Sequence, residues 1–408
     1  MIKKKLPIFG WALYDFASTI FSTNVISLYF VLWITVDKGR EDILYSIALS
    51  GSLLLAAVLQ PLLGIVSDIY RRKMPFLVFF TCLACIFTAF LAGVRGVFAG
   101  LLVFAMANIV YQIAAVFYNS LLVDVCGKEE IGRVSGLGVA VSYIGMIVGL
   151  ILTRPLVLKY GYQAAFIPTA ALFFIFSLPC FFMVKESALK ADMKSKLDIR
   201  KVFLRIKDTF SNSRKYPGLS RFIIAVFIYL NAINTIVVFL AVYLKKIGGF
   251  YDGELITIYI FSAFMAIIGS LFFGMITDRL GAKRALMISL ALGSVCLILG
   301  AFACVKVFFW ILGPFAGILI GSVWTTTRAF AIKLCPEEKL GEIFGFLGMV
   351  GKSSAILGPL VWGLSVLTFG FMGLFKYRIA ILIQDAFILF GWVLISGVPG
   401  DVPERERK

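Results

Sequence analysis

Four ionisable side chains lie inside long apolar stretches of this sequence, and they are the residues best placed to do chemistry. They are Asp15, Arg328, Lys352 and Asp385. A charge at the centre of a membrane helix costs about 2.5–3.5 kcal/mol on insertion scales, so each one needs a partner or contact with water. The two cations suit anionic groups, because a guanidinium binds a carboxylate through two parallel hydrogen bonds and an ammonium acts as a point charge. We expect roles in solute binding or ion coupling.

The same four residues also allow structural interpretations. Lys352 and Asp15 form one candidate ion pair, while Arg328 is matched by Asp15 or Asp124 as a cytoplasmic gate pair. Asp15 and Asp385 are the candidates for proton coupling, with Asp385 expected in the outer part of the last apolar run. Solute binding and structural pairing both remain open at this point.

Uncharged polar side chains interrupt the same apolar runs. Asn108, Gln112 and Asn119 are spaced four and seven residues apart, so they share one helix face. Interhelical hydrogen bonding is the alternative to solute binding for all of these amides. Many amides and few charges favour a small polar or zwitterionic solute over a polyanion. The candidate solute-binding residues are Asn24, Asn108, Gln112, Tyr118, Asn119, Asn231, Asn234, Trp324, Arg328 and Lys352.

The composition shows what kind of protein must position these residues. Of 408 residues, 61% are apolar and 15% are charged, against about 45–50% and about 25% in soluble proteins. Too few polar side chains exist to cover a soluble surface, so we expect a membrane protein, and its long apolar runs predict an all-α fold. The sequence has no histidine, no phosphate-binding Gly-x-x-x-x-Gly-Lys-Ser/Thr loop and no clustered carboxylates, which argues against an enzyme and against a cofactor or metal. The net charge of +17 is spread over loops, which argues against nucleic-acid binding.

Twelve apolar runs between residues 9 and 398 are long enough to cross a membrane. With the N-terminus inside, the cytoplasmic segments hold 27 Lys and Arg residues and the outer loops hold 10. Positive loops stay in the cytoplasm, so both termini are expected there. We expect a monomer in the bacterial inner membrane.

One long loop divides the twelve runs into two sets of six. We expect an N-terminal bundle at 1–184, a basic linker at 185–219, a C-terminal bundle at 220–400 and a cytoplasmic tail at 401–408. Apolar residues on one helical face of the linker predict a helix lying against anionic lipid headgroups. A solvated linker is the alternative.

The two halves repeat each other. Gly64 to Lys73 matches Gly274 to Arg284 at an offset of 210 residues, and Cys126 to Gly136 matches Cys335 to Gly345 at an offset of 209, with Gly149 against Gly358. Two six-helix halves in the same orientation are the plan of a carrier with a central site between its halves.

The loop Gly274-x-x-x-Asp278-Arg279-x-Gly281-x-Lys283-Arg284 resembles the signature of the major facilitator superfamily. The first-half copy keeps Asp68 and Arg72 but has Arg71 in place of glycine. The resemblance implies two pseudo-symmetric six-helix bundles, a cavity lined by helices one, four, seven and ten, and rocker-switch alternating access. It also implies coupling or gating by a set of charged residues. That set is Asp15, Asp68, Arg72, Asp124, Arg133, Asp278, Arg279, Glu342 and Asp385.

Within that superfamily the chain resembles the vacuolar amino-acid effluxers (autophagy-related permeases) and their bacterial relatives. The likeness rests on Trp11 to Ala17, Phe117 to Gly136, Tyr229 to Thr235 and Arg328 to Pro359. One departure is that Asn231-Ala232 replaces the family's Asp-Gly, which removes a carboxylate. The resemblance implies transport of small solutes, including amino acids. A lipid flippase or a non-transporting sensor on the same fold is the alternative.

Overall fold

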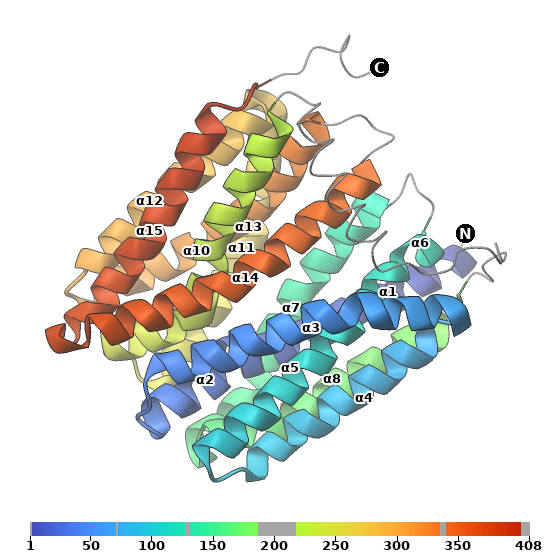
Figure 1. The fold of residues 1–408 in the computed structure, drawn as a ribbon, viewed down its shortest axis with the longest axis horizontal. Helices are drawn as coiled ribbons and strands as arrows, with labels where there is room; N and C mark the ends of the chain where they lie inside the picture. The colour runs from blue at the N-terminus through green and yellow to red at the C-terminus, as the bar shows by residue number, and fades with distance from the viewer. Residues whose placement is uncertain (1, 71, 127–130, 187–217, 335–339, 401–408) are drawn as a thin grey trace. The chain divides into compact units, whose positions relative to one another are not determined.

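The computed structural model is helical along the residues that it describes, which are 2–70, 72–126, 131–186, 218–334 and 340–400 (Figure 1). Within these ranges, 12 helices are long and apolar enough to cross a membrane. Helices satisfy every backbone hydrogen bond within their own segment, which hydrocarbon requires. The predicted all-α membrane protein with twelve spans is confirmed.

The helices follow one another with short connections. The first six spans comprise α1 (Ile2–Phe21) with its continuation η1 (Ser22–Tyr29), α2 (Phe30–Leu32) and η2 (Trp33–Asp37), then α3 (Asp42–Tyr70), α4 (Met74–Phe90) with η3 (Leu91–Gly93), α5 (Val97–Ser120) with α6 (Leu122–Val125), α7 (Ile131–Tyr160), and η5 (Tyr162–Ala165) with α8 (Phe166–Met183). The last six are α10 (Leu219–Lys246), α11 (Asp252–Leu280), α12 (Ala282–Phe302), α13 (Lys306–Leu334), α14 (Leu340–Thr368), and η7 (Gly370–Met372) with α15 (Phe375–Ser396).

The chain forms two compact units. The first comprises Met1–Met193, Val238–Lys245 and Phe250–Ala263, and the second comprises Lys194–Val237, Lys246–Gly249 and Phe264–Lys408. The predicted interfacial helix in the linker and the tail at 401–408 lie outside the described residues, so both stay predictions.

The first unit is built around α1, which packs against α7 and α8, while α5 packs against α3 and α4. Aromatic side chains fill its centre, including the parallel rings of Phe30 and Phe104, whose centroids lie 4.5 Å apart. Stacked rings bury large apolar areas at the spacing that aromatic pairs prefer.

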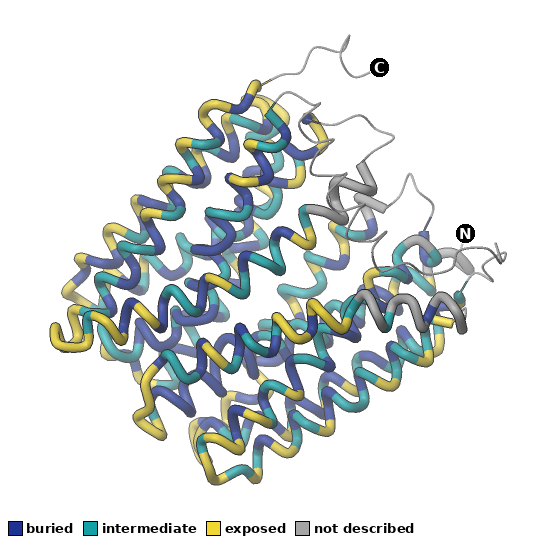
Figure 2. Tube along the Cα trace, in the orientation of Figure 1, coloured by how far each residue is buried: buried dark blue, intermediate teal, exposed yellow. Residues whose placement is uncertain are grey.

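The second unit packs α12 against α13 and α15. Its core includes Phe222, Tyr229, Phe330 and Ile388. Buried and exposed residues alternate along the helices of each unit (Figure 2). Many exposed side chains are large and apolar, such as Leu271 at 68% exposure, as expected for surfaces that face lipid.

The predicted repeat is visible in the helix boundaries. α3 and α11 each have 29 residues, and they begin at Asp42 and Asp252, which correspond under the offset of the signature loops. Asp68 and Asp278 are each third from the last residue of these helices. The turn after α11 uses Gly281 at φ +85°, a conformation that favours glycine.

Candidate functional site

Two predicted solute ligands of the first unit bond to neighbouring helices. Asn24 in η1 donates to the Thr169 hydroxyl of α8 at 2.9 Å, and Asn108 in α5 donates to the Ser52 hydroxyl of α3 at 2.7 Å. Both asparagines have no exposed surface, and the Oδ1 atom of each has no hydrogen-bond partner in the described part of the chain. Their amide nitrogens therefore have the interhelical role that was the alternative, while their oxygens stay available.

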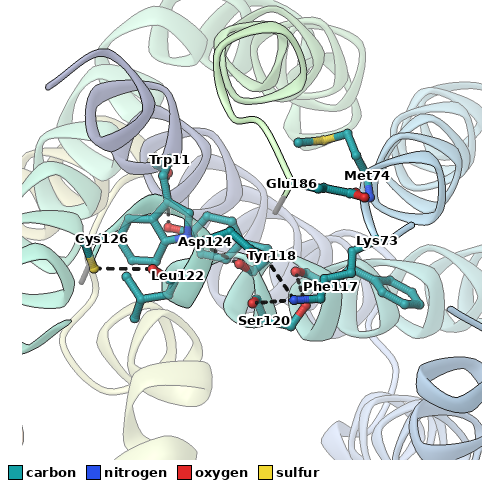
Figure 3. A network of polar contacts seen from close by, with 10 residues as sticks. All are labelled: Trp11, Lys73, Met74, Phe117, Tyr118, Ser120, Leu122, Asp124, Cys126 and Glu186. Atoms are coloured by element: carbon teal, nitrogen blue, oxygen red, sulfur yellow. Dashed lines mark hydrogen bonds and ion pairs between the residues drawn. The ribbon is translucent and has the colours of Figure 1, made fainter. Parts of the chain in front are cut away.

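Trp11 and Tyr118 join α1 to α5 by a reciprocal pair of hydrogen bonds. The Trp11 indole donates to the Tyr118 carbonyl at 3.3 Å, and the Tyr118 hydroxyl donates to the Trp11 carbonyl at 3.1 Å (Figure 3). A Cβ atom at Gly138 would lie 2.6 Å from the Asp15 carboxylate and 2.7 Å from the Trp11 ring. Trp11 therefore contacts Tyr118 of α5 on one side. Asp15 and the Trp11 ring lie so close to Gly138 of α7 that a larger side chain at this position would overlap them.

The three amide side chains that share one face of α5 differ in their exposure. Asn108 is buried, Gln112 is half-buried and Asn119 is exposed. The Gln112 carbonyl accepts a hydrogen bond from the Gln60 side chain at 2.9 Å. The three residues lie on one helix as the spacing predicted, but only Asn119 is exposed.

In the second unit, α10 presents its amides to α14. The Asn234 side chain donates to the Ser354 hydroxyl at 3.1 Å and to the Gly351 carbonyl at 3.3 Å. Lys352, which is half-buried, lies in the same turn of α14. The structure therefore brings the Lys352 segment and the α10 amides to one helix contact.

Asn231 lies one turn before Thr235 on the same helix. A Cβ atom at Gly358 would overlap the Thr235 hydroxyl and the Asn231 carbonyl, so glycine permits the close approach of α14. Asn231 is 3% exposed, and its Oδ1 atom has no hydrogen-bond partner among the described residues. A buried acceptor without a donor is costly, and a bound ligand or water would satisfy it.

Arg328 and Trp324 lie one turn apart on α13. Trp324 is half-buried against the core of the second unit, whereas Arg328 is exposed. The span that contains them has a mean hydropathy of 1.9. Since a guanidinium facing hydrocarbon is costly, this face of α13 is expected to contact water. Under the offset of the second matched motif, Arg328 corresponds to Asn119, which is exposed at the matching place of α5.

In the first-half copy of the signature loop, Lys73 forms an ion pair with Asp124. Lys73 Nζ lies 3.0 Å from Asp124 Oδ2 and donates to the Ser120 carbonyl at 3.0 Å (Figure 3). Glu186 accepts a hydrogen bond from the Met74 backbone, at the first residue of α4. A carboxylate there also interacts favourably with the helix dipole. Asp124, predicted as a gate residue, is thus the partner of Lys73.

The other predicted gate residues are only partly described. Asp278 and Arg279 are exposed in the last turn of α11, and Arg72 is exposed after α3. The side chains of Asp68, Arg133 and Glu342 lie outside the described residues, so their predicted roles in coupling or gating stay predictions.

Sequence reasoning missed one polar cluster of the first unit. Lys245 forms an ion pair with Asp252, and the Tyr162 hydroxyl donates to Asp252 at 2.6 Å. The repeat offered a signal, since Asp252 begins α11 as Asp42 begins α3. These bonds tie the end of α10 and the start of α11 to η5.

Asp385 lies deeper than expected. It is ten residues after the start of α15 and eleven before its end, so it is midway along the helix and not in its outer part. The helix begins three residues earlier than the apolar run suggested, because Phe375, Lys376 and Tyr377 continue it.

Comparisons with known proteins agree with this architecture. The family model described as Major Facilitator Superfamily matches residues 16–359 and 222–408. An uncharacterized protein of Aquifex aeolicus is 27% identical over 96% of this chain and 97% of its own length, and the uncharacterized MFS-type transporter YxiO of Bacillus subtilis is 26% identical over 96% and 94%. The crystal structure of the nucleoside transporter NupG has a TM-score of 0.73 at 17% identity, covering 96% of this chain and 98% of that one.

Proposed function

This chain belongs to the Major Facilitator Superfamily, a family of membrane transporters that are not enzymes, and we propose that it carries a small polar or zwitterionic solute. Amino acids are the leading class. The solute would move by secondary active, alternating-access transport, with the protein working as a monomer. The four stretches that resemble vacuolar amino-acid effluxers support this branch of the family.

The observation that carries the proposal is the exposed Arg328 within a membrane span. A guanidinium in contact with water inside the span can bind a carboxylate through two hydrogen bonds. Trp324, one turn away, offers an aromatic face that attracts an ammonium group. Asn231 and Asn234, from α10 of the same unit, add amides to the candidate solute site.

Few charges accompany these amides, which favours a solute with one positive and one negative group. A polyanion would need several cations. The positive-inside count supports cytoplasmic termini, and the bacterial relatives support a bacterial inner membrane.

Uptake into proteoliposomes tests the solute class. Purified protein is reconstituted and supplied in turn with labelled amino acids, nucleosides and sugars, with empty liposomes as the control. We expect saturable uptake of at least one amino acid and competition by others. Saturable uptake confined to nucleosides or sugars, or transbilayer movement of labelled lipid without any solute uptake, would replace the proposal.

A further inference from the structure

A pair of hydroxyl groups joins α11 to α13 beside the candidate solute residues of the second unit. Ser270 Oγ lies 2.7 Å from Thr325 Oγ1, and both residues are half-buried. Thr325 directly follows Trp324 in the chain and precedes Arg328 by three residues. Residues three apart on a helix are neighbours, with Cβ atoms about 5–6 Å apart. The hydroxyl pair therefore lies next to residues proposed to bind the solute.

The direction of the hydrogen bonds determines what this pair offers a ligand. Thr325 Oγ1 donates to the Gly321 carbonyl, one turn earlier on α13, at 3.0 Å. A threonine hydroxyl has one proton, so in the bond between the two hydroxyls Ser270 is the donor and Thr325 is the acceptor. The Ser270 proton is used in this bond, whereas the Ser270 oxygen keeps acceptor capacity. A ligand that bonds to Ser270 must therefore bring a hydrogen-bond donor.

Ser270 differs in this respect from hydroxyl residues nearby. Ser289 of α12 donates to the Ala285 carbonyl at 3.0 Å, and Thr277 of α11 donates to the Phe273 carbonyl at 2.7 Å. Each of these two bonds joins residues four apart within one helix, which is a common way for serine and threonine to satisfy their hydroxyls. Ser270 instead directs its proton across to α13.

Ser270 also lies away from the lipid-facing side of α11. Phe264, Ile268 and Leu271 are exposed, and their spacing of four and three residues places them on one face of the helix. At 3.6 residues per turn, Ser270 lies about 100–160° around the helix from each of them. The half-buried Ser270 hydroxyl is therefore on a different face from the side chains that contact lipid, so a polar solute can reach it.

Close backbone contact holds Ser270 in place. A Cβ atom at Gly269 would overlap the Ile318 carbonyl, and a Cβ atom at Gly321 would overlap the Ala266 carbonyl. Glycine at both positions lets α11 and α13 approach closely. A hydroxyl beside such a contact has little freedom to shift, which favours a preorganised binding site.

The matching place in the first half shows what the helix contact alone requires. Ser270 corresponds to Gln60 under the offset of the signature loops, and Gly321 corresponds to Gln112 under the offset of the second matched motif. In the first half the Gln60 amide donates directly to the Gln112 carbonyl at 2.9 Å. In the second half the matching carbonyl is reached from Ser270 through Thr325. One long side chain is thus enough to join the helices, so the two short hydroxyl residues call for an additional role.

We propose that Ser270 binds the ammonium group of the solute while Arg328 binds its carboxylate. The assignment rests on the proposed function, and it adds α11 to the helices expected to contact the solute. An ammonium group has donors and no acceptor, which complements an oxygen whose own proton is already used. The ring of Trp324, adjacent to Thr325, attracts the same cation. The arrangement favours a solute whose positive and negative groups are close together, as they are in an α-amino acid.

Calorimetry on purified, monodisperse protein tests this assignment with two ligands. One is an amino acid that the uptake panel identifies, and the other is the carboxylic acid that has hydrogen in place of its ammonium group. Ser270→Ala should weaken binding of the amino acid about tenfold, because one hydrogen bond to a charged group is lost. It should leave binding of the carboxylic acid within about threefold of the parent. Ser289→Ala, which removes a fully buried hydroxyl bonded within its own helix, should change neither affinity.

Variants of Thr325 test the direction of the hydrogen bonds. Thr325→Ser keeps the acceptor for the Ser270 proton and should bind the amino acid as the parent does, whereas Thr325→Val removes this acceptor and should weaken binding. Equal binding of the amino acid by Ser270→Ala and the parent would overturn the assignment, as would an equal loss for the amino acid and the carboxylic acid. If the parent itself binds no amino acid, the proposed solute class fails and the assignment fails with it. If the parent binds one and Ser270→Ala binds it equally tightly, only the assignment fails.

Discussion

Lys73 and Lys283 occupy matching places in the two halves, but among the described residues only Lys73 of this pair has an acidic partner. Lys73 pairs with Asp124 at 3.0 Å. The residue that corresponds to Asp124 in the second half is Lys333, so Lys283 instead donates to the Ser396 carbonyl at 2.8 Å. The matching lysine therefore forms an ion pair in the first half, whereas in the second half it donates to a neutral backbone carbonyl.

The contrast extends to the interior. In the first unit the amide nitrogens of Asn24 and Asn108 bond across helices. The second unit exposes Arg328 on a membrane span and leaves both polar atoms of Gln384 without partners among the described residues. The halves share a scaffold, and we infer that the second half carries more of the ligand chemistry.

The largest expected effect on stability comes from two matched glycines. Gly358→Ala should destabilise the protein by about 2 kcal/mol, because the new methyl group overlaps the Thr235 hydroxyl and the Asn231 carbonyl. Gly149→Ala should cost less, because it meets the Ile20 side chain, nearest at 2.8 Å. Thermal unfolding in detergent measures both. An equal loss of stability in the two variants would contradict the inference that α14 approaches α10 more closely than α7 approaches α1.

The signature-loop lysines give the next effect. Lys73→Ala should cost about 1.5 kcal/mol, because it leaves Asp124 without its charge-assisted bond. Lys283→Ala should cost about 0.5 kcal/mol at most, because its bond lies at an exposed position. Chemical unfolding of each variant provides the comparison, and Lys73→Ala/Asp124→Ala should recover part of the loss. If the double variant is as unstable as the sum of the singles, the two residues are not coupled.

The smallest effect concerns the short helices before α8 and α15. Tyr162→Phe should cost about 1 kcal/mol, because it removes the hydrogen bond to Asp252. Phe371, the counterpart of Tyr162 in the second half, is 83% exposed, so Phe371→Tyr should change stability little. Melting temperatures of the two variants test this contrast, which fails if Phe371→Tyr is the more damaging change.

The sequence predicted the twelve spans and the repeat, because apolar length and matched motifs determine them. It did not predict which face of each helix turns inward. Asn108 and Asn119 share a face by spacing, but one is buried against Ser52 and the other is exposed. Partners such as Lys73 and Asp124, which lie on different helices, depend on helix packing, which spacing within one helix does not reveal.

If the second half captures the solute carboxylate, Arg328 and its counterpart Asn119 test that capture most directly. Calorimetry on purified, monodisperse protein would measure binding of whichever amino acid the uptake panel identifies. Arg328→Ala should weaken binding by roughly a hundredfold, the loss expected when charge-assisted bonds to a carboxylate are removed, and Arg328→Lys should restore part of it. Asn119→Ala should leave binding within about threefold of the parent. Binding by Arg328→Ala as tight as that of the parent, or an equal loss in Asn119→Ala, would contradict carboxylate capture by the second half.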